Sequence, residues 1–222
     1  SWVGDERADL QVLAPSVILH SVQNDGIRDK KRRETKRRII DEAVRLVQAN
    51  GYGSVTVEDI CQAAEISRRT FFNYMDSKDE AVLGVFPFVF TPASLERIRT
   101  TPTGNMIDLI VTSLETVEDA YGPNQETRQR MLDNNPELLH AEAARKRGML
   151  TDLGRAVGDH LEHFPADRVT DWEVQEETHM IVGLFSTAMA RYLWNPSPHE
   201  DPLEGLRHTA QRITTYTKEL QW

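Results

Sequence analysis

Two arginines, an aromatic ring and an amide occupy one short stretch of this 222-residue chain. Arg68, Arg69, Phe72 and Asn73 lie at helical spacing, so all four side chains can project from one face of a helix. An arginine can bond guanine O6 and N7 together, and an aromatic ring can pack against a thymine methyl group or a sugar. These residue types at this spacing therefore predict a helix face that contacts base edges in the major groove of DNA.

The preceding residues predict a first short helix that would support that face. It begins at Thr56, whose side chain can cap the first turn together with Asp59. An apolar stripe follows at positions i, i+3, i+4 and i+7, formed by Val57, Ile60, Cys61 and Ala64. Cys61 is the single cysteine of the chain, and its place on this inner stripe favours an inert core residue over a redox switch.

A tight turn at residues 65–67 then leads into the helix that carries the arginines. Ser67 is placed to cap this second helix, which we expect to run from about Arg68 to Met75. Three apolar side chains can point inward together, namely Ile66, Phe71 and Met75. The polar face is then left to solvent, as a DNA-contacting surface requires.

The stretch from Glu34 to Ala81, ETKRRIIDEAVRLVQANGYGSVTVEDICQAAEISRRTFFNYMDSKDEA, resembles the DNA-binding domain of the tetracycline-repressor (TetR) family. The resemblance lies in a basic helix start, NGY after the first helix, T-V-x-D-I at the second, S-R-x-T-F-F-N-Y on the third, and then S-K-D-E. It implies an all-α protein with an N-terminal three-helix helix-turn-helix DNA-binding domain and a C-terminal helical ligand-binding and dimerisation domain. The chain departs from the family pattern at Glu65, where glycine is usual, and at Phe72, where tyrosine is commoner.

The resemblance also implies how DNA would be bound. Arg68 and Arg69 would contact base edges, and Phe72 would contact a thymine methyl group or a sugar. The remaining candidate contacts, mostly to phosphates, are Lys36, Thr56, Ser67, Thr70, Asn73, Tyr74 and Lys78. A homodimer would bind a near-palindromic operator with its recognition helices about one DNA turn apart, roughly 34–36 Å. The last two long helices of each subunit would pair with their copies in a four-helix bundle.

The net charge of −9 is unusual for a DNA-binding protein, but the charges are unevenly distributed. Residues 28–80 hold 12 Lys and Arg against 10 Asp and Glu, whereas the rest of the chain holds 14 against 25. The densest basic run is RDKKRRETKRR at 28–38, where 8 of 11 residues are cationic. This run is either a solvated helix start or an arm that follows phosphates, and its place beside the helix-turn-helix favours the arm.

We treat residues 1–27 as an N-terminal extension, 28–80 as the DNA-binding domain and 81–222 as the helical body. The extension is either a flexible arm or an additional helix docked on the body or the partner subunit. Asp5 and Glu6 near the start do not fit a secretory signal. No apolar run approaches the roughly 20 residues that cross a bilayer, and one cysteine fits a reducing compartment. We therefore expect a cytoplasmic protein that is not associated with membranes.

Turn signals divide the body into helices. We expect a connecting helix that carries residues 81–86, and further helices at 106–121, 125–133, from 136 through 161, 167–194 and 202–220. Five apolar side chains could line an effector pocket or could equally pack in the core: Phe86, Phe90, Met106, Trp172 and Phe185. As pocket residues they would favour an apolar or aromatic small-molecule effector.

Two groups of histidines and acids have the residue types of metal sites. They are His160 with Glu162 and His163, and His179 with Glu176 and Glu177. We interpret both as polar groups on solvent-exposed helix faces, and no Gly-rich phosphate loop, nucleophile elbow or HExxH motif accompanies them. The sequence therefore predicts a repressor released by an effector, with no enzymatic activity, cofactor or metal. Two alternatives stay open: a constitutive repressor without a ligand, and a helical metal-dependent enzyme.

Overall fold

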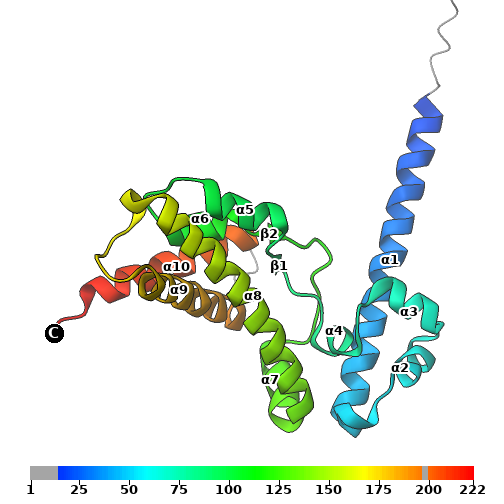
Figure 1. Ribbon diagram of the computed structural model, residues 1–222. Coiled ribbons are helices and arrows are strands. Elements are labelled where there is room, and N and C mark those ends of the chain that lie inside the picture. The colour runs from blue at the N-terminus through cyan, green and yellow to red at the C-terminus, as the bar shows by residue number, and fades with distance from the viewer. Residues whose placement is uncertain (1–14, 197–199) are drawn as a thin grey trace, which may run out of the picture.

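The computed structural model describes residues 15–196 and 200–222, with side chains from residue 26 on, and these residues form two helical lobes. We call the smaller lobe, at the right of Figure 1, the head and the larger one the body. The predicted all-α class is confirmed, since the only strands in the described part of the chain are two residues long. The helices are α1 (Pro15–Asn50), α2 (Val57–Ala64), α3 (Arg68–Tyr74), α4 (Lys78–Leu83), α5 (Pro92–Thr100), α6 (Met106–Ser113), α7 (Gln125–Asn134), α8 (Pro136–His163), α9 (Val174–Trp194) and α10 (Pro202–Glu219), with 3₁₀ turns η1 (Tyr52–Ser54) and η2 (Pro165–Asp167).

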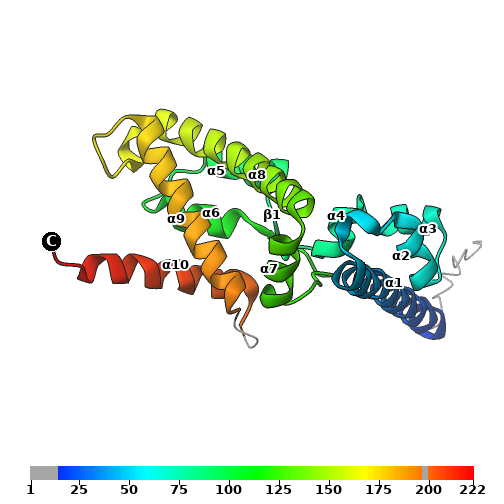
Figure 2. The same ribbon diagram turned by 90° about the horizontal axis from the view of Figure 1, so that it is seen from below.

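The first helix is 36 residues long and begins well before the basic run. Its C-terminal part buries Ile39, Ile40, Ala43 and Val47 in the head core against α2 and α4. Its N-terminal part extends past α3 and away from the body (Figures 1 and 2). Residues 15–27 therefore continue helix α1 rather than form a separate helix docked on the body, and the arm and the contact with a partner subunit stay predictions. Residues 1–14, the rest of the proposed extension, lie outside the described residues.

The connection from head to body is not the helix predicted through residue 86. Helix α4 ends at Leu83 because Gly84 adopts a φ of +84°, which an L side chain rarely adopts. A Cβ at Gly84 would also lie 2.5 Å from the Cα of Gly122, so backbone packs directly on backbone here. Val85 then pairs with Tyr121 through an N–H···O bond of 2.8 Å. The head is thus joined to the body by a fixed turn rather than by a continuous rod.

The head core extends beyond the DNA-binding segment predicted from sequence. Met131 and Leu132 of α7 and Leu138 of α8 are buried in the same apolar cluster as α1 and α2. The backbone N–H of Tyr52 donates to the Asn135 carboxamide at 2.9 Å, which ties η1 to the start of α8. The start of α8 is therefore packed and hydrogen-bonded as part of the head.

Three elements of the body differ from the predicted helices. Helix α6 ends at Ser113, and residues predicted as its continuation form β2 (Glu115–Thr116), which pairs antiparallel with β1 (Phe88–Val89). Helix α5 was not predicted, although Thr91 and Ser94 form a capping box around Pro92 at its start. Helix α9 begins at Val174, later than predicted, because residues 165–173 form η2 and a loop. The helices predicted at 125–133, from 136 and at 202–220 are confirmed.

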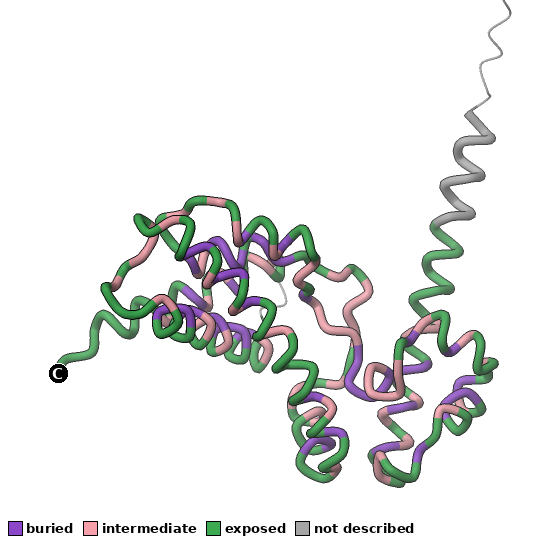
Figure 3. The backbone as a smooth tube through the Cα atoms, viewed as in Figure 1, coloured by how far each residue is buried: buried purple, intermediate pink, exposed green. Residues whose placement is uncertain are grey.

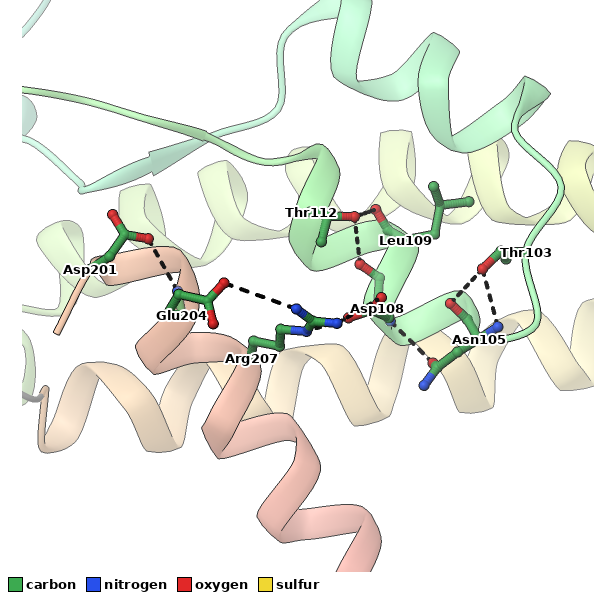
Figure 4. A network of polar contacts seen from close by, with 8 residues as sticks. All are labelled: Thr103, Asn105, Asp108, Leu109, Thr112, Asp201, Glu204 and Arg207. Atoms are coloured by element: carbon green, nitrogen blue, oxygen red, sulfur yellow. Dashed lines mark hydrogen bonds and ion pairs between the residues drawn. The ribbon is translucent and has the colours of Figure 1, made fainter.

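The last helix is anchored at one end only. Arg207 of α10 pairs with Asp108 of α6, with Nε 2.7 Å from Oδ1 (Figure 4). Leu206 and Ala210 are buried in the body core beside this pair. Beyond Ile213 the helix projects past the body, and its residues are exposed (Figure 3). Across the described residues, no helix combines the length and the apolar character needed to cross a membrane.

The interpretation of His160 as a solvent-exposed residue is wrong. Its ring is fully buried between α5 and α8, where Nδ1 lies 2.7 Å from the carbonyl oxygen of Ile98 and Nε2 lies 2.8 Å from Asp167. An N–H of Thr103 and the imidazole of His160 together lower the pKa of the Asp167 carboxyl. His163 and His179 are exposed as predicted, but Glu177 of the second group is buried and accepts from Nε of Arg168 at 2.8 Å, so the surface interpretation is wrong for it as well. In the described ranges no three His, Cys, Asp or Glu side chains converge as metal ligands.

Candidate nucleic-acid interface

Helix α2 forms as its sequence predicts. The Thr56 hydroxyl accepts from the N–H of Asp59 at 3.1 Å, and the Asp59 carboxylate accepts from the N–H of Thr56 at 2.9 Å. These bonds lower the pKa of Asp59, the backbone bond most. The predicted inner stripe is buried at Ile60, Cys61 and Ala64. The reciprocal caps and the buried stripe fix the position from which the turn to α3 starts.

Helix α3 divides into the two predicted faces. Ser67 caps it by accepting from the N–H of Thr70 at 3.1 Å. Phe71 is fully buried and meets the ring of Phe72 edge-on, with centroids 5.1 Å apart. Phe72 is 46% exposed. Arg68, Arg69 and Asn73 are exposed as well, so the set predicted to face DNA is accessible on a helix whose other side is anchored in the core.

The two arginines of this face differ in their surroundings. Arg68 pairs with Glu58 of α2, and its guanidinium lies 5.3 Å from the centroid of the Phe72 ring. Arg68, Glu58 and Phe72 therefore form one exposed unit in which the arginine already has an anionic partner. For Arg69 no ion pair forms with any described residue. Arg69 is the cation of α3 that can bond DNA without first losing a contact.

Glu65 occupies the turn between α2 and α3 in a left-handed conformation. Its φ is +56°, and within the described chain it is the only residue other than glycine with a positive φ. Its N–H bonds the last turn of α2. The αL region is disfavoured for residues with a Cβ. Glu65 therefore holds a backbone conformation that glycine would adopt more easily.

The basic part of α1 lies next to α3. The Arg32 guanidinium stands 6.0 Å from the ring centroid of Tyr74, and Nε of Arg38 donates to the carbonyl oxygen of Ala64 at 3.0 Å. Lys30 lies 4.0 Å from Glu34 in an exposed pair, and Lys36 is half-buried. At about 1.5 Å per residue, the helix continues roughly 25 Å beyond Arg32 to Pro15. The cationic segment therefore begins beside the predicted recognition helix.

Lys78 has internal partners that sequence reasoning missed. Its Nζ donates to the carbonyl oxygens of Tyr52 and Val55, each at 3.0 Å, and stands 3.8 Å from the centroid of the Tyr52 ring. The hydroxyl of Tyr52 donates to Asp79. Burial, together with this bond, raises the pKa of Tyr52 above its ordinary value. Two of the three ammonium donors thus hold η1 in place, which leaves one for a phosphate.

The five candidate effector residues do not form one site. Phe86 and Phe90 line a cleft of about 390 Å³ between the β1 region and α8. Phe86 and Phe185 line a larger cleft of about 790 Å³ between α7, α8 and α9. Met106 packs in the body core, and Trp172 is 41% exposed in the loop before α9. Phe86 lies where the two clefts meet.

Comparisons with known proteins match the head to a family of regulators. The model of the family described as "Bacterial regulatory proteins, tetR family" matches residues 39–84. The HTH-type transcriptional regulator TcmR of Streptomyces glaucescens is 30% identical over 142 residues, which cover 60% of this chain and 62% of TcmR. The HTH-type dhaKLM operon transcriptional activator DhaS of Lactococcus lactis is 42% identical over 41 residues, covering 18% of this chain and 22% of DhaS.

Among solved structures, the crystal structure of Thermus thermophilus FadR, a TetR-family transcriptional repressor in complex with lauroyl-CoA, matches 84% of this chain and 96% of that chain. The identity is 18% and the TM-score 0.32, which is too low to bear on the fold or on a ligand. The chain spans less than two thirds of the length of TcmR and of DhaS. The likeness is therefore firm for the head, where the family match lies.

Proposed function

We propose that this chain is a TetR-family regulator, a dimeric repressor released from its operator by a small-molecule effector, because its helix-turn-helix domain matches that family and a related regulator is 30% identical over 142 residues. One observation carries the proposal. The outer face of α3 presents Arg68, Arg69 and Phe72 to solvent while Phe71 anchors the helix in the head core. A helix that is buried on one face and presents cationic and aromatic side chains on the other is suited to contacts in the major groove.

The contacts divide by chemistry. Arg69 would bond a base edge directly, and Arg68 would do so by exchanging Glu58 for guanine. Phe72 would pack on a thymine methyl group or a sugar. Phosphate contacts would come from hydroxyl, amide and amino groups around α3, with the cations of α1 extending the contact along the backbone. This set is Lys36, Thr56, Ser67, Thr70, Asn73 and Tyr74, with Lys78 supplying at most one donor.

The C-terminal helices support a dimer. Tyr216, on the part of α10 that projects past the body, is 67% exposed, and Leu220, just after the end of α10, is 42% exposed. Met180 and Trp194 of α9 are 49% and 61% exposed. Apolar residues left uncovered on two neighbouring helices favour a contact with a second copy of the chain. Pairing α9 and α10 with their copies would place two α3 helices on one operator.

The body supports effector control through its clefts, whose volumes fall in the range of small-molecule sites. A constitutive repressor remains the second candidate, because family membership alone does not supply a ligand. The relatives are named as regulators, which gives the enzyme alternative no support. The sign of regulation also needs its own test, since DhaS is named an activator. Such a regulator would act in the cytoplasm, where the DNA is.

The proposal is tested by selecting bound fragments from sheared genomic DNA with the purified protein. We expect enrichment of a near-palindromic sequence with half-sites about one helical turn apart, roughly 10–10.5 bp. Arg68→Ala and Arg69→Ala should each relax the preference at one base-pair position per half-site. A reporter gene behind the selected sequence then separates repression from activation. If no sequence is enriched, or if both substitutions leave the preference intact, the assignment of α3 is wrong.

A further inference from the structure

Arg128 connects α7 to the end of α4 and to α8 through a single, largely buried guanidinium. Its Nη1 donates to the carbonyl oxygen of Leu83 at 2.9 Å, and Leu83 is the last residue of α4. Its Nη2 donates to Glu142 of α8 at 2.6 Å. The side chains of Arg128 and Glu142 are only 13% and 10% exposed. A change at Arg128 therefore acts on the residue after which the chain leaves the head.

The same guanidinium lines the larger cleft. Cations of three helices surround this cleft of about 790 Å³, namely Arg128 of α7, Lys146 of α8 and Arg191 of α9. Glu142 is the one carboxylate among its lining residues, and Arg128 and Arg145 already bond both of its oxygens. Burial lowers the pKa of Arg128, and the neighbouring Glu142 opposes that shift. The cleft thus has an excess of two positive charges.

Most of the other lining residues of the cleft are apolar, and four are polar and uncharged, namely Gln125, Gln129, Ser186 and Thr187. Leu132, Met149, Leu150, Phe185 and Met189 line it together with Phe86. A mostly apolar wall that also carries three cations complements a molecule that has a hydrophobic body and one acidic group. Phe86, Phe185 and Trp194 add three aromatic side chains, which favour a flat ligand.

We propose that this cleft binds an aromatic organic anion, and that the anion acts on the head by bonding Arg128 in place of the Leu83 carbonyl. The exchange replaces a neutral acceptor with a charged one, so Arg128 gains a stronger bond. It also frees the carbonyl at the end of α4, next to Gly84 and the Val85–Tyr121 pair that fix the turn into the body. The site rests on the proposed function, because it gives the effector a chemical class and a route to the DNA-binding head.

The first test measures binding without DNA, so it stands even if the operator assignment fails. Full-length protein is titrated by calorimetry with 2-naphthoate and with 2-naphthamide, which has the same rings and no charge. We expect the acid to bind about tenfold or more tighter, the size of one charge-assisted hydrogen-bond pair. The preference should disappear in the double variant Arg128→Met/Glu142→Met, which removes a buried ion pair together. It should persist in Arg130→Met, an exposed arginine on the same helix.

Lys146→Met gives a second variant that leaves the buried pair intact, because Lys146 is exposed. It should weaken the acid but not the amide, whereas Arg147→Met, its neighbour outside this cleft, should change neither. Equal affinity for acid and amide in the unmodified protein, or no binding of either, overturns the ligand class.

A separate measurement tests whether binding in the cleft changes the turn after α4. Hydrogen exchange at the N–H groups of Gly84 and Val85 should speed up when 2-naphthoate binds, since their bonds at 2.8 Å lie beside the freed carbonyl. The naphthamide should leave these rates unchanged. If the acid binds with the expected preference but exchange at 84–85 does not change, the cleft is a binding site and the route through Arg128 is wrong.

Discussion

The recognition helix and the head–body junction both depend on arginine, and they place it in opposite environments. On α3, Arg68 and Arg69 are exposed, and Arg68 is paired only through an exposed contact with Glu58. At the junction, Arg128 is nearly buried and bonded at both ends, to Leu83 and to Glu142. The chain therefore has two arginines open to solvent on α3, and one, Arg128, that holds α4, α7 and α8 together.

The difference follows from the cost of removing a charge from water. An exposed guanidinium keeps its hydration and adds little to folding, so it remains available for a phosphate or a base. A buried guanidinium is tolerated only with partners, and loss of one partner leaves an uncompensated charge. Substitutions on α3 should therefore change DNA binding and leave folding intact, while substitutions at the junction should do the reverse.

The largest expected effect is that of Arg128→Met. The substitution leaves Glu142 buried with Arg145 as its remaining partner and removes the bond to Leu83. We expect the free energy of unfolding to fall by about 3–5 kcal/mol, measured by urea denaturation. Arg130→Met, on the exposed side of the same helix, should change it by less than about 0.5 kcal/mol. Similar values for the two variants would show that the junction does not depend on this cation.

Arg69→Gln tests the exposed arginines of α3, the second region of the comparison. It should weaken binding to the selected operator by roughly 1–3 kcal/mol and leave the unfolding midpoint unchanged. Arg97→Gln makes the same charge change on an exposed site of α5 in the body, so it controls for net charge. Fluorescence anisotropy at a fixed salt concentration is the measurement. The assignment fails if Arg97→Gln reduces affinity as much as Arg69→Gln does.

The two regions also differ in how far sequence predicts them. The helix-turn-helix is set by local signals, since Thr56 and Ser67 cap helices whose apolar spacing is complete within about two turns of each cap. Its elements and exposed face were therefore predicted correctly. The partners of Arg68 were not, because Glu58 is ten residues away and nothing in the periodicity marks the pair.

The junction depends on contacts that no local pattern contains. Gly84 ends α4 early, but only its packing on Gly122 explains why the chain turns there. The second half of the predicted helix at 106–121 became β2 because Phe88 and Val89 supply a strand partner from another part of the chain. His160 was likewise predicted to be a surface residue, because the sequence pattern does not show its contacts with Ile98 and Asp167. Long-range partners override helical periodicity in each case.

Lys78→Met sharpens the comparison, because Lys78 was predicted to contact DNA and yet has internal bonds. Its loss leaves the carbonyls of Tyr52 and Val55 without the ammonium. We expect the free energy of unfolding to fall by about 1–2 kcal/mol, less than at Arg128, because water can reach these partly buried groups. Operator affinity of the folded protein should fall by less than that of Arg69→Gln. If the free energy of operator binding falls by more than the free energy of unfolding, Lys78 contacts DNA as the sequence predicted.

Glu65→Gly should have the smallest effect and the opposite sign. Glycine relieves the strain of a φ of +56° but makes the unfolded chain more flexible, so we expect a net gain of about 0.5–1 kcal/mol in the free energy of unfolding. Glu65→Ala removes the same carboxylate and keeps the Cβ, so it should leave stability within a few tenths of a kcal/mol of the parent. Both variants remove one negative charge beside α3, so any gain in DNA affinity from charge should be common to them. A stability gain in Glu65→Gly alone would separate backbone strain from electrostatics in the turn that positions the recognition helix.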